Sequence, residues 1–506
     1  MSIKQRVILR LKSILLSSKM FVRHGSLVFN KAFVNGSFID ANSRKQFNVV
    51  NPATGEVITP VPDMDVSDVE KTITLAHDAF KEWKNTTAKE RGIILRKWYN
   101  LLVEHQEELA RIITSEAGKP FKESLGEVAY GNSFIDWFAE ESRRINGEVI
   151  PSPVKSKRIV LIKQPIGVVG LITPWNFPHA MITRKAGAAL AAGCTCIVKP
   201  AEDTPLTALA LAALADQAGL PKGVLNVITC DRSNAPAVGK LLCESPLTAG
   251  ISFTGSTAVG KILYQQCASG VKKVAFELGG NAPFIVFNSA TIEKAVEGAI
   301  ACKFRNSGQT CVSANRIFVQ DKVFSQFVGA LKEAMDKCLK IGKTEDCNVG
   351  PLINEAQMNK VSSLVDDAVS KGAKVLLGGK KAQSHGSLFY EPTLLTDVTP
   401  DMLCAKEEIF GPIAVCYKFK TEDEVIAAAN DVRVGLAGYF YSNDIGQIWR
   451  VAEQLEVGMV GVNEGIISTA EAAFGGVKES GIGREGSHHG IDEFTDVKYI
   501  CFGNLD

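Results

Sequence analysis

The chain has 506 residues, of which 46% are apolar and 22% charged, and this composition is ordinary for a folded globular protein. One hydrophobic core rarely supports so long a chain, so we expect two or more domains. The 56 Lys and Arg residues nearly balance the 55 Asp and Glu residues, which argues against nucleic acid or an anionic membrane as a partner and favours a small molecule.

Two further patterns narrow the class of protein. The longest uncharged apolar stretch, between Lys185 and Lys199, is interrupted by glycines and falls short of the ~20 residues that a transmembrane helix needs. The 12 cysteines include no Cys-x-x-Cys pair, and the 7 histidines do not gather beside them at metal-ligand spacing. We therefore expect no membrane span, no bound metal and a reducing compartment.

The first 39 residues differ in composition from the rest. They are rich in Lys, Arg and Ser, and the first acidic residue is Asp40. Such a leader resembles a mitochondrial transit peptide, which we assign to residues 1–30, and it predicts location in the mitochondrial matrix. The alternative is a basic arm that stays attached to the mature protein.

Capping signals predict helices near the start of the folded part. Ser67-Asp68-Val69-Glu70 is typical of a capping box, and apolar residues follow at helical spacing as far as Trp83. Thr87-Ala88-Lys89-Glu90 repeats the signature before a longer amphipathic stretch that ends at Gly118 and Pro120. We interpret these helices as structural.

From Gly167 onward, short apolar runs alternate with helical segments. This pattern predicts an α/β fold with a parallel sheet that helices cover on both faces, and ligands in such sheets bind at the carboxyl ends of the strands. One helix is expected from Pro205 to Ala218, with Thr204 as its N-cap and Gly219 as its end. The predicted strands are 168–172, 195–198, 225–228, 251–253, 274–276 and 284–287. A second block, from about residue 284 to residue 474, repeats the mixture and predicts a second α/β domain across a cleft.

A glycine-containing turn follows the predicted strand at 251–253. The segment from Gly255 through Ser256 to Lys261 would let backbone amides approach a phosphate at a helix N-terminus. It fails as an ATP-binding P-loop at Ile262, where Ser or Thr should ligate magnesium, and it lacks the middle glycine of a dinucleotide fingerprint. By itself such a segment is more often an ordinary strand-to-helix turn.

Three polar side chains stand where chemistry could occur. Cys311 follows a run of polar and glycine residues, where a helix start or a nearby base could lower the pKa of its thiol, although a lone cysteine is more often a core residue. Glu277 ends an apolar strand and is a candidate general base, or equally a glutamate that faces solvent. Asn176, in the loop after strand 168–172, could donate to an oxyanion or belong to an ordinary aromatic turn.

Together these segments closely resemble the aldehyde dehydrogenase superfamily, over nearly all of the chain from Phe33 to Gly503. Six motifs carry the resemblance in order: Thr173 to Pro178, Lys199-Pro200-Ala201-Glu202, Phe253-Thr254-Gly255-Ser256, Glu277-Leu278-Gly279-Gly280, Gly308-Gln309-Thr310-Cys311 and Glu407-Glu408-Ile409-Phe410-Gly411-Pro412. The resemblance implies a Rossmann-like NAD-binding domain at 31–146 and 165–282, and a catalytic α/β domain at 283–486. It also implies β segments at 147–164 and 487–506 that build a homotetramer.

The resemblance further implies roles for single residues. Cys311 attacks an aldehyde, Asn176 and the Cys311 backbone amide hold the oxyanion, and Glu277 activates the water that cleaves the thioester. The implied cofactor residues are Trp175, Lys199, Glu202, Gly255, Ser256, Glu408 and Phe410. Because the Glu202 carboxylate can accept from a ribose 2′-hydroxyl and would repel a 2′-phosphate, NAD is expected rather than NADP.

Within the superfamily, several stretches are most similar to succinate-semialdehyde dehydrogenases. Arg184 and Arg305 match positions that hold the distal carboxylate in that group, a task suited to guanidinium, although either could be a structural salt-bridge partner. Thr469 stands where relatives usually carry a serine that contacts this carboxylate. The expected reaction is oxidation of succinate semialdehyde to succinate with NAD and water, in 4-aminobutyrate breakdown.

Three other functions stay open from the sequence alone. The chain could use Gly255 to Lys261 to bind ATP, or it could be a non-catalytic binding protein that keeps the fold. It could also keep the aldehyde chemistry and act on glutarate semialdehyde or a neutral aldehyde.

Overall fold

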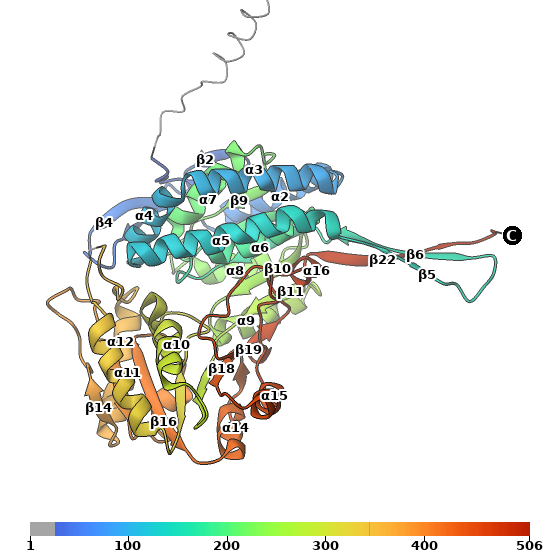
Figure 1. The fold of residues 1–506 in the computed structure, drawn as a ribbon. Coiled ribbons are helices and arrows are strands. Elements are labelled where there is room, and N and C mark those ends of the chain that lie inside the picture. The colour runs from blue at the N-terminus through green and yellow to red at the C-terminus, as the bar shows by residue number, and fades with distance from the viewer. Residues whose placement is uncertain (1–25, 344, 506) are drawn as a thin grey trace, which may run out of the picture.

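The computed structural model describes residues 26–343 and 345–505. Residues 1–25, most of the predicted transit peptide, lie outside the described residues, so that prediction stays untested. The described chain forms two α/β bodies, and a thin β arm extends from the first of them (Figure 1). Along residues 26–343 and 345–505, every helix is too short or too polar to cross a membrane.

The first body is built on an eight-stranded sheet with the order β2-β1-β9-β8-β7-β10-β11-β21. Its strands are β1 (Ala32–Val34), β2 (Ser37–Ile39), β7 (Val168–Ile172), β8 (Thr195–Lys199), β9 (Leu225–Val227), β10 (Thr248–Thr254), β11 (Lys273–Glu277) and β21 (Gly481–Ile482). Five adjacent strands, β9, β8, β7, β10 and β11, are parallel, as predicted. At the two ends of this set, β1 pairs antiparallel with β9, and β21 pairs antiparallel with β11. β21 therefore joins the first sheet although it falls within the range predicted for the second domain.

Alternate residues of the central strand β7 enter two separate hydrophobic cores. Val169 and Leu171 pack in one core, and Val168 and Ile172 pack in the other. Successive side chains of a strand point to opposite faces, so a strand with helices on both faces must be apolar throughout. The VVGLI sequence of β7 meets this requirement, and all five of its residues are buried.

Eight α-helices cover the two faces of this sheet. They are α2 (Val66–Trp83), α3 (Ala88–Glu104), α4 (Gln106–Ala117), α5 (Phe121–Glu141), α6 (Ala180–Ala192), α7 (Pro205–Gln217), α8 (Ala235–Glu244) and α9 (Thr257–Ala268). The capping box of α2 uses Asp65 and Asp68, so the predicted start at Ser67 was wrong by two residues. The Thr87 and Glu90 box of α3 is confirmed, but the long amphipathic stretch divides at His105 into α3 and α4.

A residue far away in the sequence binds the backbone at the start of α7. Thr204 is the N-cap residue, as predicted, but its side chain makes no capping hydrogen bond. Instead the buried carboxylate of Glu116, on α4, accepts from the backbone N–H groups of Leu206 at 2.7 Å and Thr207 at 2.9 Å. A carboxylate at a helix N-terminus satisfies amides that have no partner inside the helix. Glu116 thereby anchors the end of the loop that follows Lys199.

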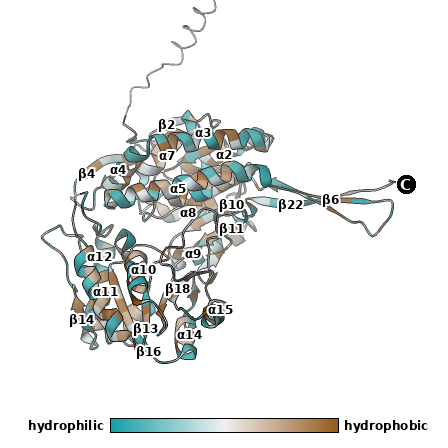
Figure 2. Ribbon diagram, viewed as in Figure 1, coloured by the Kyte–Doolittle hydropathy of each residue, from teal (hydrophilic) through white to brown (hydrophobic). Residues whose placement is uncertain are grey.

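The second body is built on a seven-stranded sheet with the order β14-β15-β16-β13-β12-β18-β19, parallel except for β14. Its strands are β12 (Pro283–Val286), β13 (Arg316–Gln320), β14 (Lys374–Leu377), β15 (Thr393–Thr396), β16 (Ile413–Phe419), β18 (Ala437–Tyr441) and β19 (Met459–Val462). Its helices are α10 (Ile292–Phe304), α11 (Phe324–Cys338), α12 (Glu355–Ser370), α13 (Leu403–Lys406), α14 (Glu422–Asn430) and α15 (Ile445–Gln454). The predicted strand 284–287 is β12, and the hydropathy colours show its sheet as apolar between more polar helices (Figure 2).

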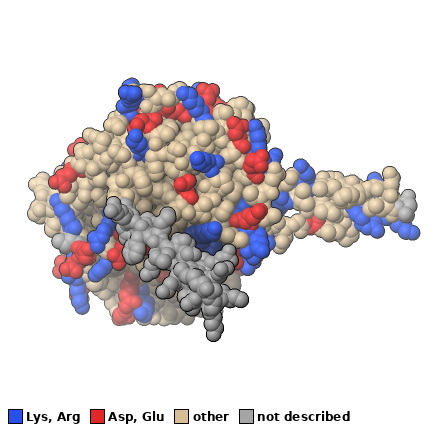
Figure 3. Space-filling view, turned by 90° about the horizontal axis from the view of Figure 1, so that it is seen from above, with Lys and Arg blue, Asp and Glu red and all other residues tan. Residues whose placement is uncertain are grey.

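The arm is an antiparallel sheet of β5 (Glu148–Ile150), β6 (Arg158–Pro165) and β22 (Thr495–Phe502). It exposes apolar side chains, with Val149 78%, Val497 62% and Tyr499 59% exposed. Short remaining elements are β3 (Gln46–Val50), β4 (Val57–Pro62), β17 (Val434–Gly435), β20 (Val477–Lys478), α16 (His489–Asp492) and two 3₁₀ turns, Ser142–Arg144 and Arg305–Gly308. On the face seen in Figure 3, positive and negative side chains are interspersed, in keeping with the balanced composition.

Candidate active site

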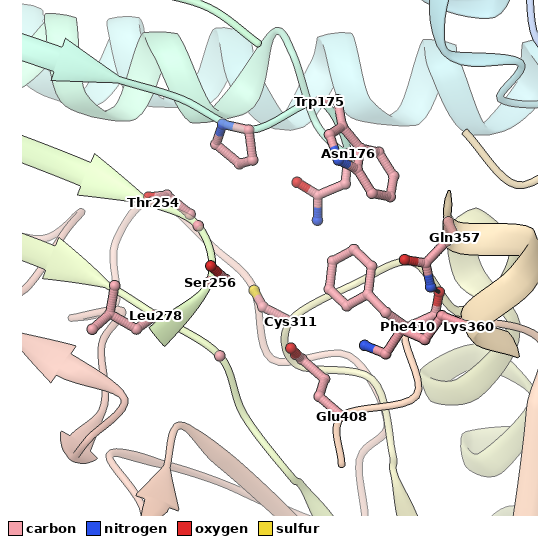
Figure 4. A pocket seen from close by; sticks show the side chains of 13 residues that line it. Trp175, Asn176, Thr254, Ser256, Leu278, Cys311, Gln357, Lys360, Glu408 and Phe410 are labelled. Atoms are coloured by element: carbon pink, nitrogen blue, oxygen red, sulfur yellow. Dashed lines mark hydrogen bonds between the residues drawn. The ribbon is translucent and has the colours of Figure 1, made fainter. Parts of the chain in front are cut away.

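A cavity of about 200 Å³ lies between the two bodies, where β7 and β10 end. We call it the thiol cavity because Cys311 lines it together with Trp175, Asn176, Ser256, Glu408 and Phe410. Figure 4 shows the Cys311 sulfur and the Asn176 amide pointing into the same space. The position agrees with the expectation that ligands bind beyond the carboxyl ends of parallel strands.

Cys311 lies in a turn between the 3₁₀ turn Arg305–Gly308 and β13. The preceding loop is unusual, because Asn306 and Ser307 have φ angles of 51° and 53°, in the left-handed region that few non-glycine residues adopt. No helix begins at Cys311, and burial raises the pKa of its thiol to about 12 while Arg184 opposes this rise. The expectation of an acidified thiol is therefore wrong for this chain.

Asn176 is buried and joined to the loop that carries the thiol. Its Nδ2 donates to the carbonyl of Gln309 at 3.1 Å. The backbone carbonyl of Asn176 accepts from Lys119 Nζ at 2.8 Å and from Asn306 Nδ2 at 3.0 Å. A side-chain amide has two N–H donors, so one hydrogen of Nδ2 remains for an oxyanion in the cavity.

Glu277 is the last residue of β11 and is only 3% exposed, which excludes a glutamate that faces solvent. Burial raises the pKa of its carboxyl well above the usual value; Glu485 raises it further, while Arg184 and Lys185 lower it. Its Oε2 has no hydrogen-bond partner within the described part of the chain. A carboxylate with a raised pKa is suited to accept a proton near neutral pH.

Cys311 also borders a second, smaller cavity of about 10 Å³, which we call the arginine cavity. It has room for roughly one water molecule. Its lining includes Arg184 and Arg305 with Tyr130, Phe177, Ser468 and Phe474. The structure therefore brings both predicted arginines to the thiol.

The two arginines have different partners. Arg184 is buried, forms an ion pair with Glu485 and lies over the Phe474 ring at 4.5 Å. Arg305 lies over the ring of Phe177 at 5.0 Å and makes no ion pair with any carboxylate in the described residues. Arg305 is thus the cation whose charge is available to a bound anion.

Thr469 does not reach this cavity. Its side chain is exposed, and its hydroxyl donates to Glu471. The adjacent Ser468 lines the arginine cavity instead. The sequence could locate this hydroxyl pair, but it could not tell which of two adjacent residues faces inward.

A third cavity, of about 530 Å³, adjoins the thiol cavity and shares Trp175, Gly255 and Ser256 with it. We call it the helix-end cavity because it lies at the N-terminus of α9. Ser256 is the N-cap of α9, and a Cβ on Gly255 would lie 2.4 Å from the Phe253 ring, so only glycine fits there. Lys199 and Glu202 also line this cavity.

These features fit a dinucleotide. The N-terminus of α9 presents backbone N–H groups that suit a phosphate, and the Glu202 carboxylate suits a ribose hydroxyl. Phe410 and Trp175 meet edge to face at 5.5 Å, and both line the thiol cavity. Burial raises the pKa of Glu408 to about 7, and its Oε1 accepts from the backbone N–H of Gly280 at 3.3 Å.

Several residues that line these cavities were not predicted from the sequence, among them three charged or polar ones. Arg232, in the loop after β9, lines the helix-end cavity and pairs with Glu202 at 2.7 Å. Gln357 and Lys360, on α12, line the thiol cavity. Arg232 could have been found because it follows a parallel strand, as the other site residues do, whereas α12 is brought in only by tertiary folding. In residues 26–343 and 345–505, no three His, Cys, Asp or Glu residues gather in a way that could hold a metal ion.

A thiol between two α/β bodies, beside a cavity suited to a dinucleotide, defines a cofactor-dependent oxidoreductase. The chain belongs to the aldehyde dehydrogenase family, whose sequence profile matches residues 38–500. Among solved structures, an NADP dependent enzyme of E. coli is 52% identical with a TM-score of 0.93, and the match covers 94% of this chain and 98% of that one. These matches confirm the predicted fold.

Several relatives have named activities. The chain is 56% identical to the mitochondrial succinate-semialdehyde dehydrogenase of Mus musculus, over 95% of this chain and 92% of that protein. It is 51% identical to the 3-sulfolactaldehyde dehydrogenase of Pseudomonas putida, over 95% and 98%. The structure of succinate-semialdehyde dehydrogenase from Burkholderia pseudomallei has a TM-score of 0.93 at 51% identity, over 96% and 100%. Betaine aldehyde dehydrogenase of Staphylococcus aureus, solved with NAD+, has a TM-score of 0.91 at 35% identity, over 96% of each chain.

Proposed function

We propose that this protein oxidises succinate semialdehyde to succinate with NAD and water. The observation that carries the proposal is that Arg305, which forms no ion pair with a carboxylate of the described residues, borders the same small cavity as the Cys311 thiol. A short aldehyde with a carboxylate at its far end can place its carbonyl at Cys311 and its anion at Arg305. The names of the mouse and Burkholderia relatives support the same substrate.

The reaction begins with the thiol. Cys311 Sγ gives its proton to solvent and forms a bond to the aldehyde carbon, and the carbonyl oxygen becomes an oxyanion held by Asn176 Nδ2 and the Cys311 backbone N–H. When bound, NAD would supply the hydride acceptor for oxidation of this adduct to a thioester. Glu277 then takes a proton from a water molecule, whose oxygen attacks the thioester carbon and releases the carboxylate and the thiol.

The pKa values of these groups bear on the rate. At neutral pH a thiol with a pKa of about 12 is almost wholly protonated, so the attack depends on a base that removes its proton. We assign this proton to solvent, and Glu277, whose carboxyl pKa is well above that of an ordinary glutamate, acts on the water that cleaves the thioester. Because both groups act in their deprotonated forms, we expect aldehyde oxidation to accelerate as pH rises from 6 toward 9.

NAD is the proposed cofactor rather than NADP. The Glu202 carboxylate lines the helix-end cavity and would repel a 2′-phosphate, and the Staphylococcus relative was solved with NAD+. Arg232 beside it and the NADP dependent relative from E. coli favour some use of NADP. Calorimetric titration with each cofactor tests the preference, and tighter binding of NADP would overturn it.

Location in the mitochondrial matrix and assembly as a tetramer are further proposals. The basic leader and the mitochondrial relative support the first, and the exposed apolar residues of the arm support the second. N-terminal sequencing of matrix material tests cleavage, and an intact Met1 would contradict it. Analytical ultracentrifugation tests the tetramer, and a monomer at micromolar concentration would contradict it.

The substrate is tested by NADH formation at saturating NAD. The measurement compares kcat/KM for succinate semialdehyde, glutarate semialdehyde, 3-sulfolactaldehyde and hexanal on the purified protein. Preference for succinate semialdehyde supports the proposal. Preference for either of the other two anionic aldehydes would keep the arginine cavity and change the substrate, and preference for hexanal would remove the role of Arg305.

A further inference from the structure

One face of helix α5 is directed toward the two loops that form the thiol cavity. Glu123, Glu127 and Tyr130 lie at positions i, i+4 and i+7 of α5, so their side chains share a face. Tyr130 lines the arginine cavity. Each of the two glutamates accepts from the backbone of one loop of the thiol cavity. Neither has a role in the chemistry proposed above.

Glu127 binds the loop that carries Asn176. Its Oε1 accepts from the backbone N–H of His179 at 2.9 Å, at the start of α6. Its Oε2 forms an ion pair with Lys119, and Lys119 Nζ donates to the carbonyl of Asn176 at 2.8 Å. Both charged side chains are at most 1% exposed, so these bonds are made without competition from water.

Glu123 binds the loop that carries Cys311. Its Oε2 accepts from the backbone N–H of Asn306 at 2.8 Å. Asn306 and Ser307 are both left-handed, a conformation that is costly for residues with a Cβ and persists only when surrounding contacts hold it. Glu123 provides one such contact directly on the strained backbone.

The two loops also bond to each other. Asn306 Nδ2 donates to the carbonyl of Asn176 at 3.0 Å, and Asn176 Nδ2 donates to the carbonyl of Gln309 at 3.1 Å. Helix α5 therefore holds both loops. Glu127 binds the loop of Asn176, and Glu123 binds the loop of Cys311.

We propose that Glu123 and Glu127 are positioning residues that set the placement of the Asn176 amide relative to the Cys311 thiol. The inference rests on the proposed function, in which these two groups act on one carbonyl. Small displacements of reacting groups reduce rates by up to about a hundredfold. Loss of either glutamate should therefore slow thioester formation without changing how the substrate anion is bound.

The first test compares Glu123→Ala with Glu123→Gln. Glutamine keeps an oxygen that can accept from Asn306, and alanine does not. We expect the alanine variant to form NADH in its first turnover about tenfold more slowly, with KM within about twofold of wild type, and the glutamine variant to recover most of the rate. Glu140→Ala is the matched control, since Glu140 is also on α5 but pairs with Arg96 and is 59% exposed.

The second readout does not depend on turnover. Iodoacetamide labelling of Cys311, followed by peptide mass spectrometry, should become at least about threefold faster in Glu123→Ala, because a released loop exposes a thiol whose pKa burial raises. Cys196 and Cys416 are buried elsewhere and should label at the wild-type rate, which separates a local shift from unfolding.

Glu127 needs a paired variant. Glu127→Gln alone leaves the Lys119 ammonium buried without its carboxylate and is expected to impair folding. The double variant Lys119→Met with Glu127→Gln removes both charges, and we expect it to fold, to bind substrate normally and to be about tenfold slower in the first turnover because Asn176 has lost a donor.

The outcomes separate the proposals. Wild-type first-turnover rates and wild-type Cys311 labelling in Glu123→Ala, with a normal rate in the double variant, would overturn the positioning role. Oxidation of no aldehyde by the wild-type protein would overturn the proposed function. Labelling that still distinguishes Glu123→Ala from Glu140→Ala would then show that Glu123 holds the Cys311 loop in place.

Discussion

The Nε atom of Arg232 lies 2.7 Å from Oε1 of Glu202, at the edge of the cavity proposed for the cofactor. A carboxylate and a guanidinium thus share the position where NAD and NADP differ. We predict that Glu202→Gln frees Arg232 for a 2′-phosphate and tightens NADP binding by about tenfold, while NAD binding weakens. Calorimetric titration measures both affinities. Adding Arg232→Ala should abolish the gain, and an unchanged NADP affinity in Glu202→Gln would contradict this role.

Replacing the buried Glu277 should separate the two halves of the reaction. In Glu277→Gln the water that cleaves the thioester loses its base, so steady-state turnover should fall by about a hundredfold or more. One equivalent of NADH should still appear in a fast first turnover, because thioester formation does not use Glu277. Stopped-flow absorbance measures both phases, and normal steady-state turnover would show that Glu277 is not the base for hydrolysis.

The two arginines should respond differently to replacement. Arg305→Gln removes a guanidinium that lacks a carboxylate partner in the described chain, so kcat/KM for succinate semialdehyde should fall by about tenfold to a hundredfold while hexanal is unaffected. Arg184→Gln also takes a partner from the buried Glu485 and should destabilise the fold by about 3 kcal/mol. Steady-state kinetics and urea unfolding test the pair, and equal losses with hexanal would contradict the anion role of Arg305.

Lys303 makes stability depend on pH. Its Nζ is buried with no hydrogen-bond partner in the part of the chain described, and burial lowers its pKa from 10.5 to about 8. As pH falls from 10.5 to 8, the unfolded chain binds a proton at Lys303 before the folded protein does, so the folded protein loses stability over this range. Above pH 10.5 the lysine is neutral in both states and this loss is absent. We predict that Lys303→Met stabilises the protein below pH 8 by on the order of 3 kcal/mol, and that this gain shrinks toward pH 10.5. Melting temperatures of the two proteins across this range measure it, and an equal difference at every pH would contradict it.

Local sequence predicted the parts of this protein that local chemistry determines. The five parallel strands of the first sheet are marked by apolar runs such as that of β7, and the Thr87 box marks the start of α3. Motifs in the sequence marked Asn176 and Cys311, which line the thiol cavity, and the two arginines, which line the arginine cavity with Cys311.

What the sequence missed depends on contacts between distant segments. At the start of α7 the Glu116 carboxylate, rather than the Thr204 side chain, accepts from the backbone N–H groups, because folding brings a residue from α4 to that helix end. The pKa of Cys311 is raised because the thiol is enclosed by segments from both bodies, which the neighbouring residues alone do not reveal. Likewise, only the packed structure shows that Ser468 faces inward and Thr469 outward.

The central claim is that Cys311 carries the substrate as a thioester, and peptide mass spectrometry of Glu277→Gln tests it most directly. The variant is mixed with succinate semialdehyde and NAD, quenched in acid within the first turnover and digested. We predict a succinyl group on the Cys311 peptide, absent without NAD and absent when Cys311→Ala is added. A Cys311 peptide that stays unmodified while NADH is formed would contradict the claim.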